Sequence, residues 1–228
     1  MDGNRRWALA NGYRIEQGYE RGVDALRTCI ECCRSTGVRA LTVFALSADN
    51  LMRSDSEINF LMRLMEDCVK REVDEMQRNG ICLHFVGDID GLPDSLRREL
   101  AAAEKRTAHN SELHLSFCLS YSGQQDIVRV ARELAREASE GELRPEAINE
   151  QLISERLATG FLSKDFGIDS RPDLLIRAGG QLRLSNFLLW ETAYTELYFI
   201  DKMWPALEEK DLLLAFREFS LRQRRFGV

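Results

Sequence analysis

Stretches with helical spacing alternate along this chain with short apolar runs that are rich in β-forming residues. Residues 18–35 place Val23, Leu26 and Ile30 on one helical face. Residues 40–46 then have the length and composition of a strand buried in a parallel sheet. This alternation predicts a single α/β domain over residues 1–228, in which helices flank a mainly parallel central sheet. The predicted helices are 18–35, 55–77, 92–106 and 125–138, and the predicted strands are 40–46, 81–86, 112–119 and 173–176.

Composition narrows the class of protein. With 228 residues, 44% of them hydrophobic, the chain can bury a substantial core, and its net charge of −6 argues against a nucleic-acid partner. All apolar runs are shorter than the roughly 18 residues of a transmembrane helix. Cys29-x-x-Cys32 lies in a helical pattern with no histidine nearby, so we expect the six cysteines to be reduced thiols. His84, His109 and His114 are scattered, and we assign them no chemistry.

The segment 176–199 gathers cationic and polar side chains around glycine. Arg177, Arg183 and Ser185 surround a two-glycine turn at residues 179–180. Two guanidinium groups and a hydroxyl beside a flexible turn suit an anion with several oxygens, and diphosphate is the obvious candidate. An apolar run then leads to Glu196, whose carboxylate can hold the Mg2+ that a diphosphate carries.

The first residues of the chain form a second site of the same kind. Asp2 is another hard oxygen ligand, and the residues after it stand where a strand should lead into a helix, whose free N–H groups favour phosphate. Read alone, Asp-Gly-Asn is also typical of a tight turn. Two anion sites, two carboxylates and no nucleotide motif indicate chemistry between two phosphorylated small molecules. The residues of this second anion site are Gly3, Asn4, Arg5 and Arg6.

Ligand-binding loops of a parallel sheet gather at the carboxyl ends of its strands. Ser47, Gly87 and Arg177 directly follow predicted strands, as Asp2 should. We therefore expect segments that are far apart in the sequence to share one site.

Five motifs are spread over essentially the whole chain. They are M-D-G-N-R-R at residues 1–6, F-A-L-S-A-D-N-L-M-R at 44–53, F-V-G-D at 85–88, the segment 176–199, and R-R-F-G at 224–227. Their sequences and order resemble those of the cis-prenyltransferases, the undecaprenyl diphosphate synthase family. The resemblance implies the fold of that family and a Mg2+-dependent homodimeric enzyme that couples isoprenoid diphosphates. The all-helical trans-prenyltransferases are excluded, because the chain lacks their D-D-x-x-D clusters.

The resemblance also implies roles for single residues. Asp2 and Glu196 match two ligands of one Mg2+, and Arg225 and Gly227 match a terminal element that reaches the acceptor site of the partner subunit. Residues 47–53 also fit a helix cap, and Arg225 fits an ordinary surface charge. The matched donor diphosphate site is Gly3, Asn4, Arg5, Arg6 and Arg53, the acceptor diphosphate site is Arg177, Arg183, Ser185, Arg225 and Gly227, and the catalytic residues are Asp2, Asn4, Ser47 and Asn50.

The chain departs from the family's pattern around the acceptor rather than at the phosphates. Phosphate arginines and metal acids are retained, while residues that position the acceptor's carbon skeleton and receive its proton have changed. We therefore expect a changed acceptor. The usual G-H reads Gly18-Tyr19, the usual S-S-E-N-W-x-R-P reads S-A-D-N-L-M-R-S at 47–54, the usual N-Y-G-G-R reads S-Y-S-G-Q at 120–124, and the last residue of R-T-S/G-G-E is Gln181.

A second dimethylallyl diphosphate as the acceptor would react through its internal alkene carbon and give a branched ten-carbon diphosphate, as in the plant members that this chain most resembles. Two alternatives stay open. One is a short-chain cis-elongating synthase that adds isopentenyl diphosphate and makes neryl diphosphate or longer products, and the other is a non-catalytic subunit of a heteromeric family member. The predicted helix 55–77 should line the product tunnel, with Phe60, Met62 and Met65 as candidates to block it.

The family places a buried strand before its D-G-N motif, which here begins at residue 2. We therefore expect that this sequence is a trimmed form and that any targeting segment preceded it. In a plant the expected location is the plastid stroma, and otherwise the cytoplasm.

Overall fold

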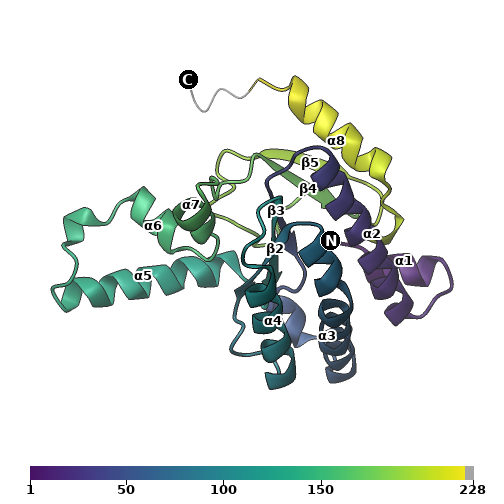
Figure 1. The fold of residues 1–228 in the computed structure, drawn as a ribbon, viewed down its shortest axis with the longest axis horizontal. Helices are drawn as coiled ribbons and strands as arrows, with labels where there is room; N and C mark the ends of the chain where they lie inside the picture. The colour runs from purple at the N-terminus through teal and green to yellow at the C-terminus, as the bar shows by residue number, and fades with distance from the viewer. Residues whose placement is uncertain (224–228) are drawn as a thin grey trace.

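Five parallel strands form two sheets in the computed structural model of the protein, which describes residues 1–223 (Figure 1). One sheet has the order β1-β3-β2, and the other pairs β4 with β5. The predicted α/β fold, a parallel sheet flanked by helices, is confirmed. The strands are β1 (Ala40–Phe44), β2 (Ile81–Gly87), β3 (Leu113–Leu119), β4 (Leu174–Ala178) and β5 (Glu196–Ile200), and the helices are α1 (Asn4–Ala10), α2 (Ile15–Ser35), η1 (Ala48–Met52), α3 (Asp55–Arg78), α4 (Asp94–Thr107), α5 (Gly123–Ser139), η2 (Pro145–Ala147), α6 (Glu150–Arg156), α7 (Phe161–Phe166), η3 (Trp204–Ala206) and α8 (Glu209–Leu221).

All the predicted helices and strands form, with ends displaced by up to three residues. Helix α2 begins earlier than predicted because the Gln17 side-chain oxygen accepts the Arg14 backbone N–H at 3.0 Å and closes the first turn. Helix α4 begins after Pro93, since the residue before a proline avoids the helical conformation. The periodicity did not reveal β5, α6, α7 or α8.

The three-stranded sheet is buried on both faces, as parallel sheets usually are. On one face Leu83, Leu113 and Leu115 are at most 5% exposed and belong to a core that also contains residues of α2, α3, α4 and α8. On the other face Val86 and Cys118 pack with Phe161 of α7. Strand β1 therefore reads as a short apolar run, whereas β2 and β3 carry His84, His114 and Ser116 on the face toward α7.

Two glycines bring α1 against α2. A methyl group at Gly18 would overlap the Asn4 carbonyl oxygen, and one at Gly22 would overlap the Asn4 side chain. The Trp204 indole N–H also donates to the Gly22 carbonyl at 2.8 Å. Only a residue without a Cβ permits this approach, and the contact holds the N-terminal segment in place beside the sheets.

Side chains of α4 and the turn after it cover the free edge of β2. Thr107 Oγ1 accepts the Leu83 N–H at 3.0 Å, and Glu104 Oε1 accepts the Phe85 N–H at 2.8 Å. Asn110 Nδ2 donates to the Ile81 carbonyl at 2.7 Å. These bonds satisfy backbone groups that an unpaired edge strand would otherwise expose.

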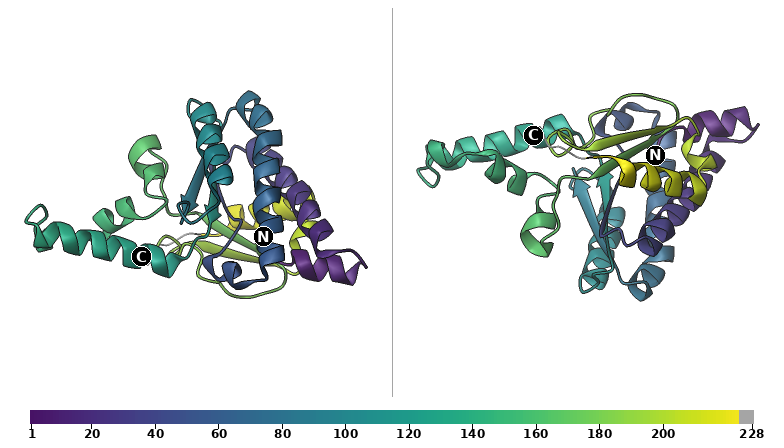
Figure 2. Two further views of the ribbon diagram at one scale, coloured as in Figure 1. Left: turned by 90° about the horizontal axis from the view of Figure 1, so that it is seen from below. Right: turned by 90° about the horizontal axis from the view of Figure 1, so that it is seen from above.

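Helices α5 and α6 extend to one side of the sheets as an arm (Figure 2). Val130 and Leu134 of α5 form a small core with Leu157, and Arg156 pairs with Glu137 at 2.7 Å. Within residues 1–223, no helix combines the length and the apolar character that crossing a membrane requires.

We expect Thr107→Val to destabilise the protein, because it keeps the shape of a fully buried side chain and removes the hydroxyl that accepts the Leu83 N–H. A buried donor left unpaired costs about 1–3 kcal/mol, which urea unfolding will measure. Thr28→Val is the matched control, since the Thr28 hydroxyl only donates to a carbonyl of its own helix. Equal losses in the two variants would contradict the role of Thr107 at the edge.

Candidate active site

A cavity of about 1420 Å3 lies among β1, α3, β4 and the N-terminal segment. Leu41, Leu61 and Ile176 are part of an apolar wall, while partly exposed arginines and Asp2 form the charged part of the lining. Such a cavity suits a molecule with a hydrocarbon body and an anionic head. The predicted site residues that line it are Asp2, Gly3, Asn4, Arg5, Arg6, Ser47, Asn50, Arg53, Arg177 and Ser185.

Asp2 and Arg177 join the two predicted anion sites. Arg177 Nη2 donates to Asp2 Oδ2 at 3.0 Å, and Arg6 Nη2 donates to Asp2 Oδ1 at 3.2 Å. Burial acts to raise the pKa of the Asp2 carboxyl, but the hydrogen bonds and charges of Arg177 and Arg6 together lower that pKa below its usual value. The carboxylate is therefore ionised at neutral pH, as a metal ligand must be.

The turn after β4 lies directly against the N-terminal segment. Gly179 has a φ of 91°, and a Cβ at this position would lie 2.8 Å from Arg6 Nη2 and 3.2 Å from Asp2 Cβ. Its N–H donates to the Lys202 carbonyl at 2.8 Å, which ties the turn to the end of β5. Glycine is needed here both for the backbone conformation and for the close approach of Arg6.

Arg177 also orders the segment that follows this turn. Its Nη1 donates to Ser185 Oγ at 2.6 Å and to the Arg183 carbonyl oxygen. The Arg183 side chain is exposed and is not part of the cavity lining among the described residues. Of the predicted acceptor residues, Arg177 and Ser185 therefore lie at the cavity, Arg183 contributes its backbone, and Arg225 and Gly227 lie outside the described residues 1–223.

Glu57 holds a second charged cluster at the cavity. Its carboxylate accepts hydrogen bonds from the Tyr19 hydroxyl at 2.6 Å and from Arg53 Nη1 at 2.9 Å, and it pairs with Arg5 at 3.3 Å. Arg53 Nη1 also donates to the Tyr19 hydroxyl oxygen. Burial and the hydrogen bond to Glu57 raise the pKa of Tyr19 to about 12. The phenol stays protonated at physiological pH and cannot serve as a general base there.

Ser47 caps a helix as well as lining the cavity. Its Oγ accepts the Asn50 backbone N–H at 3.1 Å at the start of η1. Its backbone also forms a parallel bridge with Tyr121, which brings the segment 120–124 beside this loop. Ser47 therefore caps the short helix η1 and not the predicted helix 55–77, and its hydroxyl oxygen keeps a second lone pair that can accept a further hydrogen bond.

Asp2 and Glu196 bind different arginines within one chain, and the metal ion that they are predicted to share stays a prediction. Glu196 pairs with Leu174 at the start of β4, whereas Asp2 contacts Arg177, three residues farther along the same strand. Glu196 instead accepts a hydrogen bond from Arg222 at 2.8 Å.

Helix α3 lines the cavity, as predicted, but not through all three candidate residues. Met65 is part of the wall, whereas Met62 is buried in the neighbouring core cluster that contains Leu46, and Phe60 packs near the Tyr19 ring. The face of α3 that carries Met65 therefore lines the cavity. The lining residues from α3 are Leu61, Leu64, Met65, Cys68, Val69, Glu72, Val73 and Met76.

Sequence reasoning missed the part that Glu57 plays in the site. Glu57 follows Arg53 by four residues, a spacing at which opposite charges meet on a helix, and this signal was available. The contact with Tyr19, 38 residues away, had no comparable signal.

The family model described as "Putative undecaprenyl diphosphate synthase" matches residues 1–227. "Cis-prenyltransferase 4, chloroplastic" of Solanum lycopersicum is 43% identical over 227 residues, which cover 100% of this chain and 72% of that protein. A "Ditrans,polycis-undecaprenyl-diphosphate synthase ((2E,6E)-farnesyl-diphosphate specific)" of Xanthomonas axonopodis pv. citri (strain 306) is 43% identical over 228 residues, 100% of this chain and 86% of that protein.

Solved structures give a similar result. The crystal structure of lavandulyl diphosphate synthase from Lavandula x intermedia, in complex with dimethylallyl diphosphate, matches with a TM-score of 0.94 at 37% sequence identity. The match covers 100% of this chain and 95% of that chain.

Glu57→Gln should remove a pH-dependent part of the stability. Burial acts to raise the pKa of Glu57, but the hydrogen bond from Tyr19 and the charges of Arg53 and Arg5 together lower it below its usual value. A lowered pKa in the folded state means that the stabilisation is full above the unfolded-state pKa and is lost as the pH falls through the folded-state value. At pH 7 the variant should be about 1.5–3 kcal/mol less stable.

Urea unfolding of both proteins at several pH values measures this difference. The difference in the free energy of unfolding between the two proteins should shrink below about pH 4.5, where the carboxyl of the unfolded chain begins to bind a proton. The exposed Glu20 offers a control, since Glu20→Gln should leave the stability nearly unchanged. A gap of constant size down to about pH 3 would contradict the proposed network.

Proposed function

We propose that this chain, which belongs to the undecaprenyl diphosphate synthase family, joins two molecules of dimethylallyl diphosphate head-to-middle into the branched ten-carbon lavandulyl diphosphate. Membership of the family makes the protein a prenyltransferase of isoprenoid biosynthesis. Our proposal concerns the acceptor, dimethylallyl diphosphate, and one observation is its main support. Tyr19, a protonated phenol held by Glu57, stands where the elongating pattern of the family has histidine.

In the proposed reaction the C–O bond of the donor breaks and diphosphate leaves. The internal alkene carbon of the acceptor bonds to the donor carbon that lost the diphosphate, and the acceptor then releases one proton as its alkene re-forms. The released diphosphate can take this proton, since Tyr19 stays protonated and the Asp2 and Glu57 carboxylates already accept hydrogen bonds from arginines. The apolar wall excludes water from the reacting carbons.

The charged lining divides between the two substrates. Arg5, Arg6 and Arg53, with Gly3 and Asn4, are proposed to bind the donor diphosphate, because they belong to the N-terminal segment and the loop after β1. Arg177 and Ser185 are proposed to bind the acceptor diphosphate beside the turn after β4. Ser47 and Asn50 precede Arg53 in the chain and line the same cavity, where they can contact phosphate oxygens.

Mg2+ is part of the proposal, with Asp2 as its protein ligand. The Asp2 carboxylate is ionised, partly exposed and part of the cavity lining. Mg2+ at such sites needs one or two carboxylates together with substrate phosphate oxygens, so the residues present fit the ion. When bound, it would neutralise the donor diphosphate and help it to leave. We leave Glu196 of the same chain out of this site, because it binds Arg222.

The other departures support a changed acceptor. Gln181 replaces a glutamate of the elongating pattern, and a neutral amide can donate a hydrogen bond but cannot take a proton. Leu51 replaces the usual tryptophan on η1. The similarity to a lavandulyl diphosphate synthase that binds dimethylallyl diphosphate supports the same acceptor here.

A cis-elongating synthase is the second candidate, and two observations favour it. The curated relatives include undecaprenyl and dehydrodolichyl diphosphate synthases, and the cavity extends along α3 past Met65 to Met76. A non-catalytic subunit is less well supported, because Asp2, Arg53 and Arg177 line one cavity.

We further propose that the protein acts as a homodimer and, in a plant, in the plastid. The terminal Arg225 and Gly227 would reach the acceptor site of the partner subunit. Two relatives from Solanum lycopersicum carry the word chloroplastic in their names, which supports the location.

Incubation with dimethylallyl diphosphate alone and Mg2+ tests the choice of acceptor. We expect a branched ten-carbon alcohol after dephosphorylation, identified by gas chromatography and mass spectrometry, and poor use of added isopentenyl diphosphate. A methyl-sized difference in a pocket is worth only about 1–3 kcal/mol, so a minor linear product should accompany it. Dominant long-chain products with both substrates would refute the proposal.

Asp2→Ala should abolish turnover and leave the fold intact, since it removes the proposed metal ligand and Mg2+ contributes several kcal/mol to leaving-group stabilisation. Initial rates at saturating Mg2+ measure the loss, and circular dichroism checks the fold. Asp165→Ala, which changes an exposed acid outside the cavity lining, is the control and should keep its activity. Near-normal turnover of the Asp2 variant would contradict the assignment of Asp2 as the Mg2+ ligand.

A further inference from the structure

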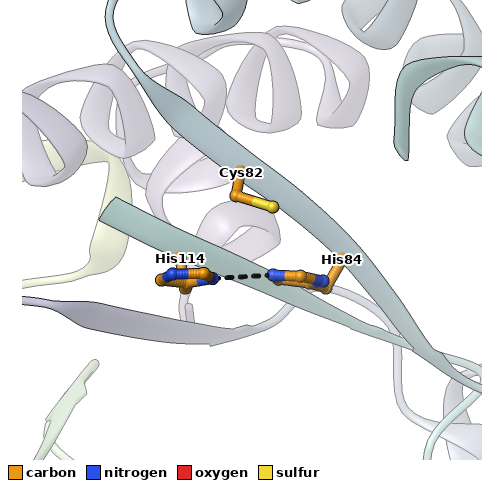
Figure 3. Close-up of side chains that lie close together, drawn as sticks. All are labelled: Cys82, His84 and His114. Carbon is orange, nitrogen blue, oxygen red and sulfur yellow. Dashed lines mark hydrogen bonds between the residues drawn. The ribbon is translucent and has the colours of Figure 1, made fainter. Parts of the chain in front are cut away.

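Three side chains with soft or borderline ligand atoms meet on one face of the three-stranded sheet. Cys82 and His84 are two residues apart on β2, and His114 is the register partner of Cys82 on β3. Residues two apart on a strand, and register partners on neighbouring strands, point to the same face. Figure 3 shows the Cys82 sulfur beside the hydrogen bond that joins the two imidazoles.

The spacing of the three side chains is close to that of a metal site. His84 Nε2 and His114 Nδ1 are 3.1 Å apart, and one ligand atom from each of the three residues lies within 4.8 Å of the others. Two nitrogens on one tetrahedral Zn2+, at about 2.0–2.1 Å from the ion, stand roughly 3.4 Å apart. Small rotations of the two rings would direct both nitrogens to an ion, and the sulfur would need to approach by about 1 Å.

The surroundings of the cluster are those of a closed site. Cys82 is 2% exposed and His114 is 4% exposed. The Phe166 ring of α7 lies 4.2 Å from the His114 ring, and the Phe161 ring lies 4.5 Å from the His84 ring, both between centroids. An apolar shell of this kind limits access of water to a metal and fixes its ligands.

A buried polar atom beside the cluster lacks a hydrogen-bond partner. Ser116 is the register partner of His84 on β3 and therefore shares its face of the sheet. Ser116 is fully buried, and its Oγ has no hydrogen-bond partner among the described residues. Buried hydroxyls are normally satisfied, so an unpaired one opposite His84 on the same face points to a further polar group here, such as a water on a fourth coordination position.

We propose that Cys82, His84 and His114 bind Zn2+. Thiolate and imidazole are the ligands that Zn2+ prefers, whereas Mg2+ prefers oxygen, so the site is chemically distinct from the one at Asp2. It is also separate in the fold. Cys82 and His114 are the second residues of β2 and β3, whereas the loops of the diphosphate cavity follow the carboxyl ends of the strands.

Zn2+ at this place would join β2 to β3 on the face that α7 covers. Binding replaces the thiol proton of Cys82 and the hydrogen bond between the two histidines with three metal bonds. Because the unfolded chain does not hold these three ligands together, the ion would stabilise the folded state. The role proposed is therefore structural, and it does not depend on which isoprenoid product the protein makes.

The test measures zinc in the full chain after removal of metals with a chelator. Isothermal titration and native mass spectrometry should find one Zn2+ per chain, and Co2+ in its place should give the absorption bands of a cobalt–thiolate complex. An excess of Zn2+ should raise the melting temperature by roughly 5–10 °C. Cys82→Ser and His84→Gln should each weaken binding about 100-fold or more, since loss of a mere supporting residue already costs about 10–100-fold.

Two controls separate this site from adventitious binding. His109→Gln changes the exposed third histidine and should bind Zn2+ as the unchanged chain does. Asp2→Ala should also retain one tight site, which shows that the carboxylate of the cavity is not the ligand. Circular dichroism checks that the Cys82 and His84 variants fold, and the half-buried His84 is the milder of the two changes. The proposal would be overturned if the unchanged chain bound no Zn2+ tightly, or if the Cys82 and His84 variants bound Zn2+ as tightly as the unchanged chain.

Discussion

The hydrogen-bonded charges of Asp2 and Arg177 join segments that are 175 residues apart in the sequence. The Arg177 side chain is only 13% exposed, so a charged group in this position needs a partner, and Asp2 provides it. Arg177 also binds Ser185 and the Arg183 carbonyl, so one guanidinium joins the N-terminal segment to the segment after the β4 turn. The two anion sites indicated by the motifs are therefore neighbours with a shared wall.

This arrangement depends on places where the backbone comes unusually close. Gly179 lets Arg6 lie against the turn after β4, and Gly18 and Gly22 let α1 lie against α2. Ser185, with a φ of 52°, adopts a conformation that L-residues rarely use, in the segment that Arg177 holds. Strained backbone of this kind is kept where surrounding contacts determine it fully, and here it accompanies the residues proposed to bind diphosphate.

The two ends of the sheet differ in chemistry. At the carboxyl ends of the strands the chain presents the oxygen ligands and arginines of the cavity lining, which suit Mg2+ and diphosphate. Near the amino ends of β2 and β3 it presents a thiol and two imidazoles beneath aromatic rings. The parallel arrangement produces this separation, because every loop after a strand emerges at the same edge.

The sequence by itself determined the parallel α/β architecture, the family and most of the polar residues that line the cavity. Periodicity and the order of motifs can both be read from the sequence without the tertiary structure. The short strand β5 and the helix α8 lacked a clear pattern and were not predicted. Only the tertiary structure decided that Glu57 binds Tyr19 and Arg53, that Glu196 faces Arg222 rather than Asp2, and that Cys82 meets two histidines. Strand register and helix packing set such contacts, and they couple residues whose separation in the sequence carries no periodic signal.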